Sequence, residues 1–346
     1  MKSYINKQLV KLEGKIIKKF RTLNKRDFSI KYLINYLIYL NLFTEKLLLK
    51  KNYNPEPEII KEIKYLLMML DRLESLKEFS KKNYNIQKFE MEKNHQILFQ
   101  KLWTNYSFKQ FKKERLERYE KRIKINKLQS FIRNKTVVDF GCGHGNFLMS
   151  MTKFKLKKGV GIDYGKKTIE YAKKYKNKYL RNQKLTFLQR TVYNTKLKSN
   201  YFDLGIQNGV FHHLKYEDKA YKECSRVLKK GGFLWLYTDG GGGLRDYITD
   251  LTQDLLKNVK NEFLQNQIKF FNLSINKTYH LDDNMSAKYK HYDLPAIKKK
   301  LKKFGFKFVR QLKGGFKTDF DFPYYKDKFF KKKFGSGDLR LLFVKE

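Results

Sequence analysis

Two acidic residues and a group of closely spaced glycines are the part of the sequence best suited to binding a ligand. An apolar run ends at Asp139 and is followed by glycines at alternate positions, Gly141, Gly143 and Gly145, and then by a helix-like segment. This order predicts a strand, a tight turn and a helix N-terminus. Glycine lets a ligand approach the backbone there, and the first N–H groups of a helix have no partner within it. The segment is therefore predicted to bind a ligand.

The glycine spacing and the two acids narrow the chemistry of that ligand. The pattern is not the dinucleotide fingerprint, because Asn146 stands where the last glycine of that fingerprint would be. Asp163 ends the next expected strand, about 20 residues after the glycines, and is placed to accept hydrogen bonds from both ribose hydroxyls of an adenosine. Asp139 precedes the turn and suits a cationic group, such as an amine or a sulfonium, better than a phosphate. The residues therefore predict a nucleoside ligand that carries positive charge.

Two adjacent histidines, His212 and His213, are the candidates for proton transfer. One interpretation is a general base that deprotonates an acceptor hydroxyl. The other is a packing and capping pair that follows a strand. Adjacent histidines do not have the spacing of metal ligands, and no metal site is predicted.

Strands and helices alternate from residue 135 onward. The expected strands are 137–140, 159–163, 185–188, 202–207, 233–238, 307–312 and 339–344. The expected helices between them are 166–176, 221–228 and 295–304, and Gly231 and Gly232 are expected to turn the chain into the fifth strand. This alternation predicts an α/β fold with a doubly wound, mostly parallel, seven-stranded Rossmann-like sheet. The last two strands have no helix between them, which predicts an antiparallel edge strand.

An all-helical N-terminal region is expected to precede this sheet. Residues 1–82 show apolar side chains at helical spacing, and we expect 83–130 to be a helical lead-in or lid. Trp103 and Tyr106 share a helix face in that lead-in, where they either pack against the next domain or form a wall over a ligand. The remaining domain, 131–346, is expected to carry insertions at about 239–292 and 313–338.

Four segments resemble, in order and spacing, the motifs of class I S-adenosylmethionine (SAM) dependent methyltransferases of the type 11 group. They are VVDFGCGHG at 137–145, GIDY at 161–164, FDLGIQNGVFHHL at 202–214 and ExxRVLKKGG at 223–232. The resemblance covers roughly residues 130–238. It implies a Rossmann-like methyltransferase fold with SAM as the cofactor.

The resemblance also implies roles for individual residues. The 141–145 turn, which includes Cys142, and Asp139 would contact the methionine part of SAM, and Asp163 would bind the ribose. Asn208 would face the site of methyl transfer. The residues near the adenine would be Tyr164, Thr191 and Val192, although many family members have an acid where Thr191 stands.

The methyl acceptor is less well defined by the sequence. Methyltransferases that act on the amino groups of bases have a proline pair after the fourth strand, whereas this chain has Asn-Gly-Val-Phe at 208–211. We expect in-line transfer to a small-molecule, lipid or envelope-glycan acceptor, most simply at oxygen, with an RNA acceptor as the alternative. Candidate acceptor-binding residues in the first insertion are Asp239, Arg245 and His280.

The chain is strongly basic, with 77 Lys and Arg against 34 Asp and Glu and a net charge of +43. Either the codon bias of an AT-rich genome or a polyanionic partner such as RNA explains this charge. Two cysteines cannot form a disulfide framework, and no signal peptide or membrane-spanning run is present, so a cytoplasmic protein is expected. The helical N-terminal region is a possible surface for homodimerisation.

Overall fold

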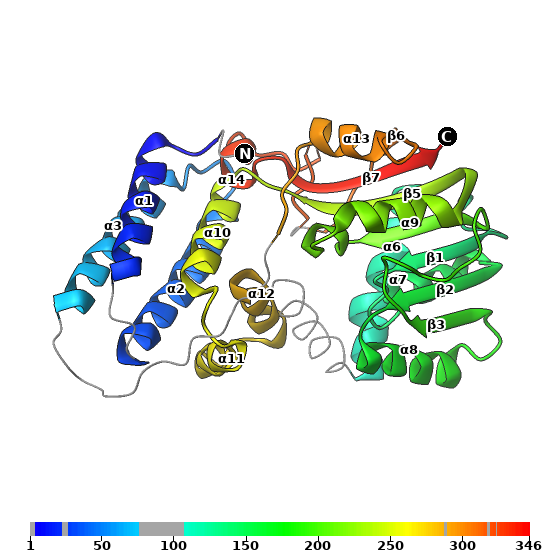
Figure 1. The fold of residues 1–346 in the computed structure, drawn as a ribbon, viewed down its shortest axis with the longest axis horizontal. Coiled ribbons are helices and arrows are strands. Elements are labelled where there is room, and N and C mark those ends of the chain that lie inside the picture. The colour runs from blue at the N-terminus through cyan, green and yellow to red at the C-terminus, as the bar shows by residue number, and fades with distance from the viewer. Residues whose placement is uncertain (1–3, 23–26, 76–106, 287–288, 317–318, 323) are drawn as a thin grey trace. The chain divides into compact units, whose positions relative to one another are not determined.

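The computed structural model describes residues 4–22, 27–75, 107–286, 289–316, 319–322 and 324–346 (Figure 1). The chain folds into two compact units. The sheet unit contains described residues of 96–240, 289–325 and 337–346, and the helical unit contains described residues of 1–95, 241–288 and 326–336. Each unit is considered by itself below.

The sheet unit is built on one seven-stranded sheet with the order β3-β2-β1-β4-β5-β7-β6. The strands are β1 (Thr136–Phe140), β2 (Lys158–Asp163), β3 (Leu185–Gln189), β4 (Phe202–Asn208), β5 (Leu228–Gly240), β6 (Phe306–Gln311) and β7 (Gly337–Lys345). Strands β1 to β5 are parallel, and β7 runs antiparallel to both β5 and β6. The predicted Rossmann-like sheet is confirmed (Figure 1).

Helices cover the faces of this sheet. They are α5 (Phe108–Gln110), the π-helical turn η1 (Phe111–Leu116), α6 (Glu117–Ile125), α7 (Asn146–Ser150), the 3₁₀ turns η2 (Met151–Phe154) and η3 (Phe211–His213), α8 (Lys166–Tyr179), α9 (Glu217–Val227) and α13 (Leu294–Lys302). One buried cluster joins Phe140 and Leu236 of the sheet to Tyr221 of α9 and Ile297 of α13. Strands buried on both faces read as nearly continuous apolar runs, which explains why β1 could be recognised in the sequence.

Strand register places several polar side chains on one face of the sheet. Asp139 of β1 pairs with Ile206 of β4, and Asn208 of β4 pairs with Tyr237 of β5. Side chains alternate between faces along a strand, so Asp139, Asn208, Tyr237 and Asp239 belong to the same face. Because parallel strands end at a common edge, these residues gather at the carboxyl edge of the sheet, where open α/β sheets bind ligands.

Two element boundaries differ by four residues or more from those predicted. Helix α9 begins at Glu217 rather than at Tyr221, and β5 begins at Leu228 rather than at Phe233. Gly231 and Gly232 were predicted to form a turn, but they lie within β5, where the pairing with β4 shifts register between Phe202 and Leu204. Gly231 has φ of +73°, so it supplies an irregularity inside the strand rather than a loop before it.

A buried ionic network lies at the antiparallel side of the sheet unit. Arg340 of β7 contacts Asp319, Asp321 and Asp338, at 3.0 Å for Asp319 and 3.3 Å for Asp338. Arg122 of α6 lies 2.7 Å from the same Asp319 carboxylate. All of these side chains are nearly inaccessible to solvent, so the network ties α6 and the segment after β6 onto β7.

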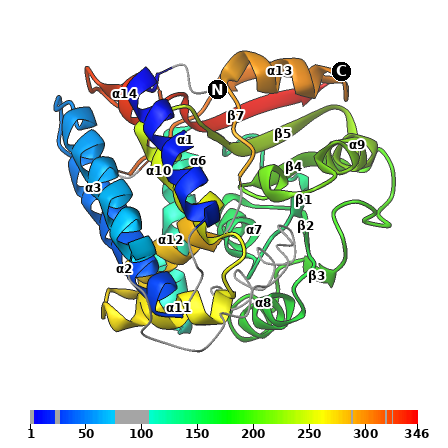
Figure 2. The same ribbon diagram turned by 60° about the vertical axis from the view of Figure 1, so that its left-hand side comes forward.

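The helical unit combines N-terminal helices with segments from much later in the chain. Its helices are α1 (Lys7–Thr22), α2 (Asp27–Leu48), α3 (Glu56–Ser75), α10 (Leu244–Leu256), α11 (Asn261–Phe270), α12 (Ile275–Ser286) and α14 (Phe330–Phe334). Asn41 of α2 donates to Thr252 of α10 at 2.9 Å, and Tyr247 of α10 donates to the Leu9 carbonyl of α1 at 2.9 Å. Helix α10 packs against α1 and α2 (Figure 2). None of the described helices is long and apolar enough to cross a membrane.

Candidate active site

The glycine turn after β1 has the backbone geometry that its sequence predicted. Gly141, Gly143 and Gly145 have φ values of +74°, +53° and +80°, which side-chain-bearing residues rarely adopt. The Gly141 N–H donates to the Ile162 carbonyl at 2.7 Å and ties the turn to β2. A Cβ atom on Gly145 would lie 2.6 Å from the Phe187 ring. The turn therefore packs closely against Phe187 of β3. Gly145 is the residue immediately before α7.

The Asp163 carboxylate holds the glycine turn in place. One of its oxygens accepts a hydrogen bond from the Gly143 N–H at 2.8 Å, and the other accepts from the Gly165 N–H at 2.8 Å and the Thr168 hydroxyl at 3.3 Å. Burial raises the pKa of Asp163 and these bonds oppose that rise. The carboxylate at the end of β2 thus organises the loop into which β1 runs.

Asp139 is a buried acidic residue near the end of β1. Its side chain is buried, and no described residue forms a hydrogen bond or an ion pair with its carboxylate. Burial, and to a smaller extent the nearby Asp163 carboxylate, raise the pKa of Asp139 to about 8. A buried carboxylate without such a partner is stable only when it is protonated or when a cation approaches it. The position therefore favours a positively charged ligand.

Asn208 lies at the end of β4, on the same sheet face. Its side-chain amide donates to the Tyr119 hydroxyl of α6 at 2.9 Å, while its buried side-chain oxygen has no hydrogen-bond partner among the described residues. The Tyr119 ring stacks on Phe147 of α7 at a centroid distance of 4.4 Å. No sequence motif marked Tyr119, because its partner is far away along the chain. The unsatisfied oxygen of Asn208 is a second polar atom suited to a ligand.

The two adjacent histidines are buried in η3. His212 Nδ1 lies 3.3 Å from the Thr238 hydroxyl, and the Tyr289 ring packs on His212 and His213 at 5.6 and 4.5 Å. Burial lowers the pKa of His212 to about 4. The nearby Asp239 carboxylate opposes this change, whereas His291 and Lys290 lower the pKa further. The structure shows the packing that one interpretation expected, and a base role for either residue stays a prediction.

The remaining predicted site residues are distributed over both units. In the sheet unit, Tyr164 is exposed after β2, Thr191 and Val192 follow β3, and the Cys142 thiol is buried with a raised pKa. Asp239 lies near the end of β5. Arg245 and His280 belong to α10 and α12 of the helical unit. Trp103 and Tyr106 lie outside the described residues.

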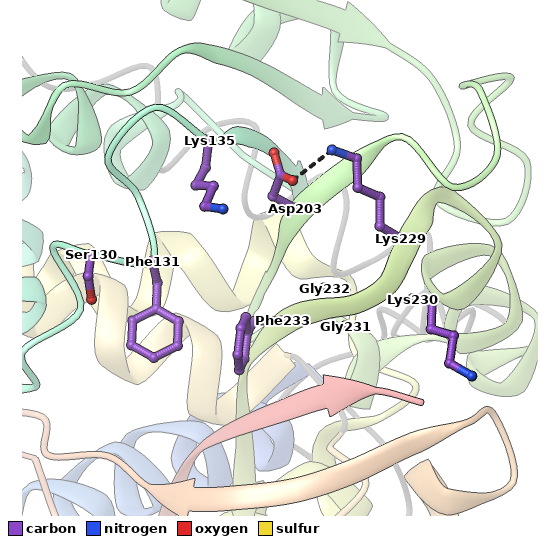
Figure 3. Close-up of a pocket in the computed structure, with 9 residues that line it drawn as sticks. All are labelled: Ser130, Phe131, Lys135, Asp203, Lys229, Lys230, Gly231, Gly232 and Phe233. Carbon is purple, nitrogen blue, oxygen red and sulfur yellow. Dashed lines mark hydrogen bonds and ion pairs between the residues drawn. The ribbon is translucent and has the colours of Figure 1, made fainter.

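A cavity of about 430 Å³ lies at the opposite edge of the sheet, where β4 and β5 begin. It is lined by Ser130, Phe131, Lys135, Asp203, Lys229, Lys230, Gly231, Gly232 and Phe233 (Figure 3). Lys229 pairs with Asp203 at 2.7 Å, and the Phe131 and Phe233 rings meet edge to face at 4.7 Å. This cavity is separate from the glycine turn, which follows the other end of β1.

The strand order and the turn after β1 define a Rossmann-like nucleotide-binding fold. Residues 138–236 match the family model described as "Methyltransferase domain". That range contains the glycine turn, both acids and Asn208. This part of the chain is therefore a SAM-dependent methyltransferase domain, with SAM as its cofactor.

Matches to curated proteins cover only part of this chain. A sterol 24-C-methyltransferase of Aspergillus fumigatus is 33% identical over 107 residues, which is 30% of this chain and 28% of that protein. A mitochondrial ubiquinone biosynthesis O-methyltransferase of Dictyostelium discoideum is 26% identical over 133 residues, 36% of this chain and 41% of that protein. Thus the chain spans less than half the length of either relative. A SAM-dependent methyltransferase structure from Aquifex aeolicus aligns with a TM-score of 0.43 and 18% identity, covering 70% of this chain and 100% of that one.

The polar atoms at the carboxyl edge fit SAM. Its methionine part carries an ammonium and a sulfonium, and Asp139 is a buried carboxylate that a cation would stabilise. Its ribose offers two hydroxyls as donors, and the Asp163 oxygen that accepts from the Gly143 N–H retains one lone pair beyond the bonds that hold the turn. Gly141, Gly143 and Gly145 of the turn carry no Cβ atom, so the backbone at these positions can be approached closely.

The raised pKa of Asp139 makes the affinity for SAM depend on pH. The carboxyl is protonated below about pH 8, whereas a cationic ligand favours the carboxylate. SAM binding at pH 7 is therefore expected to release up to about one proton, and the affinity is expected to rise from pH 6 to pH 8. The stability of the ligand-free fold changes with pH in the opposite direction. Because the pKa of Asp139 is raised by folding, the free energy of unfolding falls as the pH rises from about 4 to about 8.

Calorimetric titrations in two buffers of different ionisation enthalpy measure this proton release. The Asp139→Asn variant is the matched control, since it keeps the side-chain shape and should remove the proton release. An affinity that stays constant from pH 6 to pH 8 in the wild-type protein would contradict the assignment of Asp139 to a cationic ligand.

Proposed function

We propose that this chain transfers a methyl group from SAM to an oxygen atom of a small-molecule, lipid or envelope-glycan acceptor. The observation that carries the proposal is the buried Asp139 carboxylate beside the glycine turn, with Asp163 at the end of the neighbouring strand. This combination suits a nucleoside that carries positive charge and does not suit a pyrophosphate.

In the proposed complex each residue has a defined task. Asp139 and the 141–145 turn, with Cys142, hold the methionine part, and Asp163 accepts from the ribose hydroxyls. Asn208 borders the site of transfer, where its unsatisfied oxygen contacts a polar group of the ligand. The adenine would lie near Tyr164, Thr191 and Val192.

The chain's contribution to the reaction is positioning and exclusion of water. When bound, SAM supplies a methyl group that is activated by the positive charge on its sulfur. The residues around Asn208 need only align the acceptor in line with the carbon–sulfur bond, shield the site, and remove a proton where the acceptor carries one. Candidates for acceptor contacts outside the cofactor site stay Trp103, Tyr106, Asp239, Arg245 and His280.

The nature of the acceptor is supported by two observations. The matched relatives are named for a sterol and for ubiquinone biosynthesis, which are not nucleic acids. The segment after β4 is Asn-Gly-Val-Phe and has no proline pair. The net charge of +43 and the lysine-lined cavity would also suit a polyanion. RNA methylation is therefore the alternative function that the test below distinguishes.

The test is label transfer from methyl-labelled SAM into an extract of the producing cells, separated into organic-soluble, small aqueous, polysaccharide, RNA and protein fractions. The proposal expects label in one of the first three fractions, stable to ribonuclease, and about background label with the Asp139→Ala variant. Label that appears only in ribonuclease-sensitive material would overturn the proposal in favour of RNA methylation. The proposal would also be overturned if protein that binds SAM transferred no label to any fraction.

A further inference from the structure

A short segment before α13 crosses the carboxyl ends of the strands in the sheet unit. The Lys290 N–H donates to the His212 carbonyl at 3.0 Å, and the Tyr292 N–H donates to the Asp239 carbonyl at 3.1 Å. These two backbone bonds connect the segment to η3 on one side and to β5 on the other. They flank His291, so the backbone of that residue is fixed at the edge of the sheet where the cofactor site lies.

The side chain of His291 forms a close pair with Asp239. Its Nδ1 atom lies 2.7 Å from an Asp239 carboxylate oxygen, and the two side chains are 10% and 15% exposed. A carboxylate accepts a proton-bearing nitrogen, so the pair favours the imidazole tautomer with its proton on Nδ1. In that tautomer the basic lone pair is on Nε2. Both side chains are therefore largely removed from bulk water.

The strand register places this pair close to the proposed site of methyl transfer. Asn208 pairs with Tyr237 across β4 and β5. Asp239 is two residues further along β5, on the same face of the sheet, and a strand advances about 3.3 Å per residue. Asp239 therefore lies one side-chain position beyond the neighbour of Asn208, at the same edge as the glycine turn.

We propose that His291 is the general base for this chain's methyl transfer, and that Asp239 is the positioning residue that fixes the His291 tautomer. The inference rests on the proposed transfer to oxygen. The acceptor hydroxyl gives its proton to His291 Nε2 as its oxygen forms a bond to the methyl carbon. The carbon–sulfur bond breaks with both electrons on sulfur, which leaves S-adenosylhomocysteine, the methylated acceptor and an imidazolium that returns its proton to solvent.

His291 has a carboxylate partner on its ring at hydrogen-bond distance. His212 instead meets the Thr238 hydroxyl and the Tyr289 ring, and its burial lowers its pKa to about 4, which makes it a weak base at neutral pH. The charged groups that act on His212 include Asp239, His291 and Lys290. Of these, Asp239 lies 2.7 Å from His291 Nδ1 and would stabilise an imidazolium there.

The first experiment compares wild type with the His291→Gln and Asp239→Asn variants in two assays, SAM titration by calorimetry and initial label transfer into the acceptor fraction. The expected result is SAM affinity within about threefold of wild type and a transfer rate lower by about a hundredfold or more for His291→Gln, the usual scale of general base catalysis. The low-pH limb of the rate profile should vanish in the same variant. Lys299→Gln, which changes an exposed side chain on α13, is the control and should transfer at about the wild-type rate.

A second measurement does not depend on turnover. Histidine ¹⁵N spectra of the wild-type protein should show His291 with its proton on Nδ1, and Asp239→Asn should lose this preference while Asp239→Glu retains it. A His291→Gln variant that binds SAM and transfers label at the wild-type rate would overturn the base role, as would a wild-type spectrum with the proton on Nε2. A wild-type protein that transfers no label at all would instead refute the proposed function on which the inference rests.

Discussion

Replacing Arg340 by alanine is expected to lower the free energy of unfolding by about 3–5 kcal/mol, the cost of removing one partner from a buried ion pair. Its guanidinium contacts three carboxylates, those of Asp319, Asp321 and Asp338, and it is 4% exposed. Removal of the cation leaves those carboxylates in a region from which water is excluded. The network also joins α6 to β7 through Arg122, so the position of Tyr119 in α6 depends on it.

Urea unfolding followed by circular dichroism measures this loss. The pKa of Asp321 is raised to about 6, chiefly by burial, so lowering the pH from 7.5 to 5 protonates carboxylates that Arg340 no longer neutralises. The destabilisation should therefore be smaller at pH 5. Lys307→Ala is the matched control, since its exposed ammonium lies 3.6 Å from Glu346 and such pairs contribute little. A loss below about 1 kcal/mol at both pH values would contradict a structural role for the network.

The Asp163→Ala variant is expected to bind SAM about a hundredfold or more weakly. The carboxylate is proposed to bind the ribose, and it also accepts from the Gly143 and Gly165 N–H groups at 2.8 Å. Hydrogen bonds to a charged group contribute about 1.5–3 kcal/mol each, and the loss of two explains a reduction of this size. The substitution removes both a ligand contact and the support of the turn.

Calorimetric titration with SAM at pH 7.5 measures this affinity, and a urea unfolding curve shows whether the variant is folded. Asp163→Asn separates the two contributions, because the amide retains one accepting oxygen and should lose less affinity than alanine. Glu170→Ala, an exposed acid on α8, controls for the change in net charge. Affinity within threefold of wild type for a folded Asp163→Ala protein would contradict the ribose assignment.

Much of the sheet unit could be predicted because its signals are local. Strands β1 to β4 and the helix after β2 show an apolar pattern within each segment, and the alternation of strands with helices implies parallel pairing. No helix was predicted between the last two strands, and the structure places the short α14 there, within the helical unit. The two strands nevertheless pair antiparallel, as predicted. The family was identified for the same reason, since its motifs are short segments at strand ends.

The features that escaped prediction depend on contacts between distant residues. The bond between Tyr119 and Asn208 and the pair of His291 with Asp239 join elements that no local pattern connects. The long start of β5 was missed because Gly231 and Gly232 normally indicate a turn. The packing of the first insertion against the N-terminal helices depends on complementary apolar faces and on the buried hydrogen bond between Asn41 and Thr252. Sequence periodicity does not show which helix faces pack together.

The central claim, that the glycine turn and its two acids bind SAM, is tested most directly by titrating the intact wild-type chain with SAM and, separately, with the dinucleotide NAD⁺. The expected result is saturable binding of SAM at one site per chain, with proton release near neutral pH, and no saturable binding of NAD⁺ over the same concentration range. Failure of folded protein to bind SAM saturably, or tighter binding of NAD⁺ than of SAM, would contradict the claim.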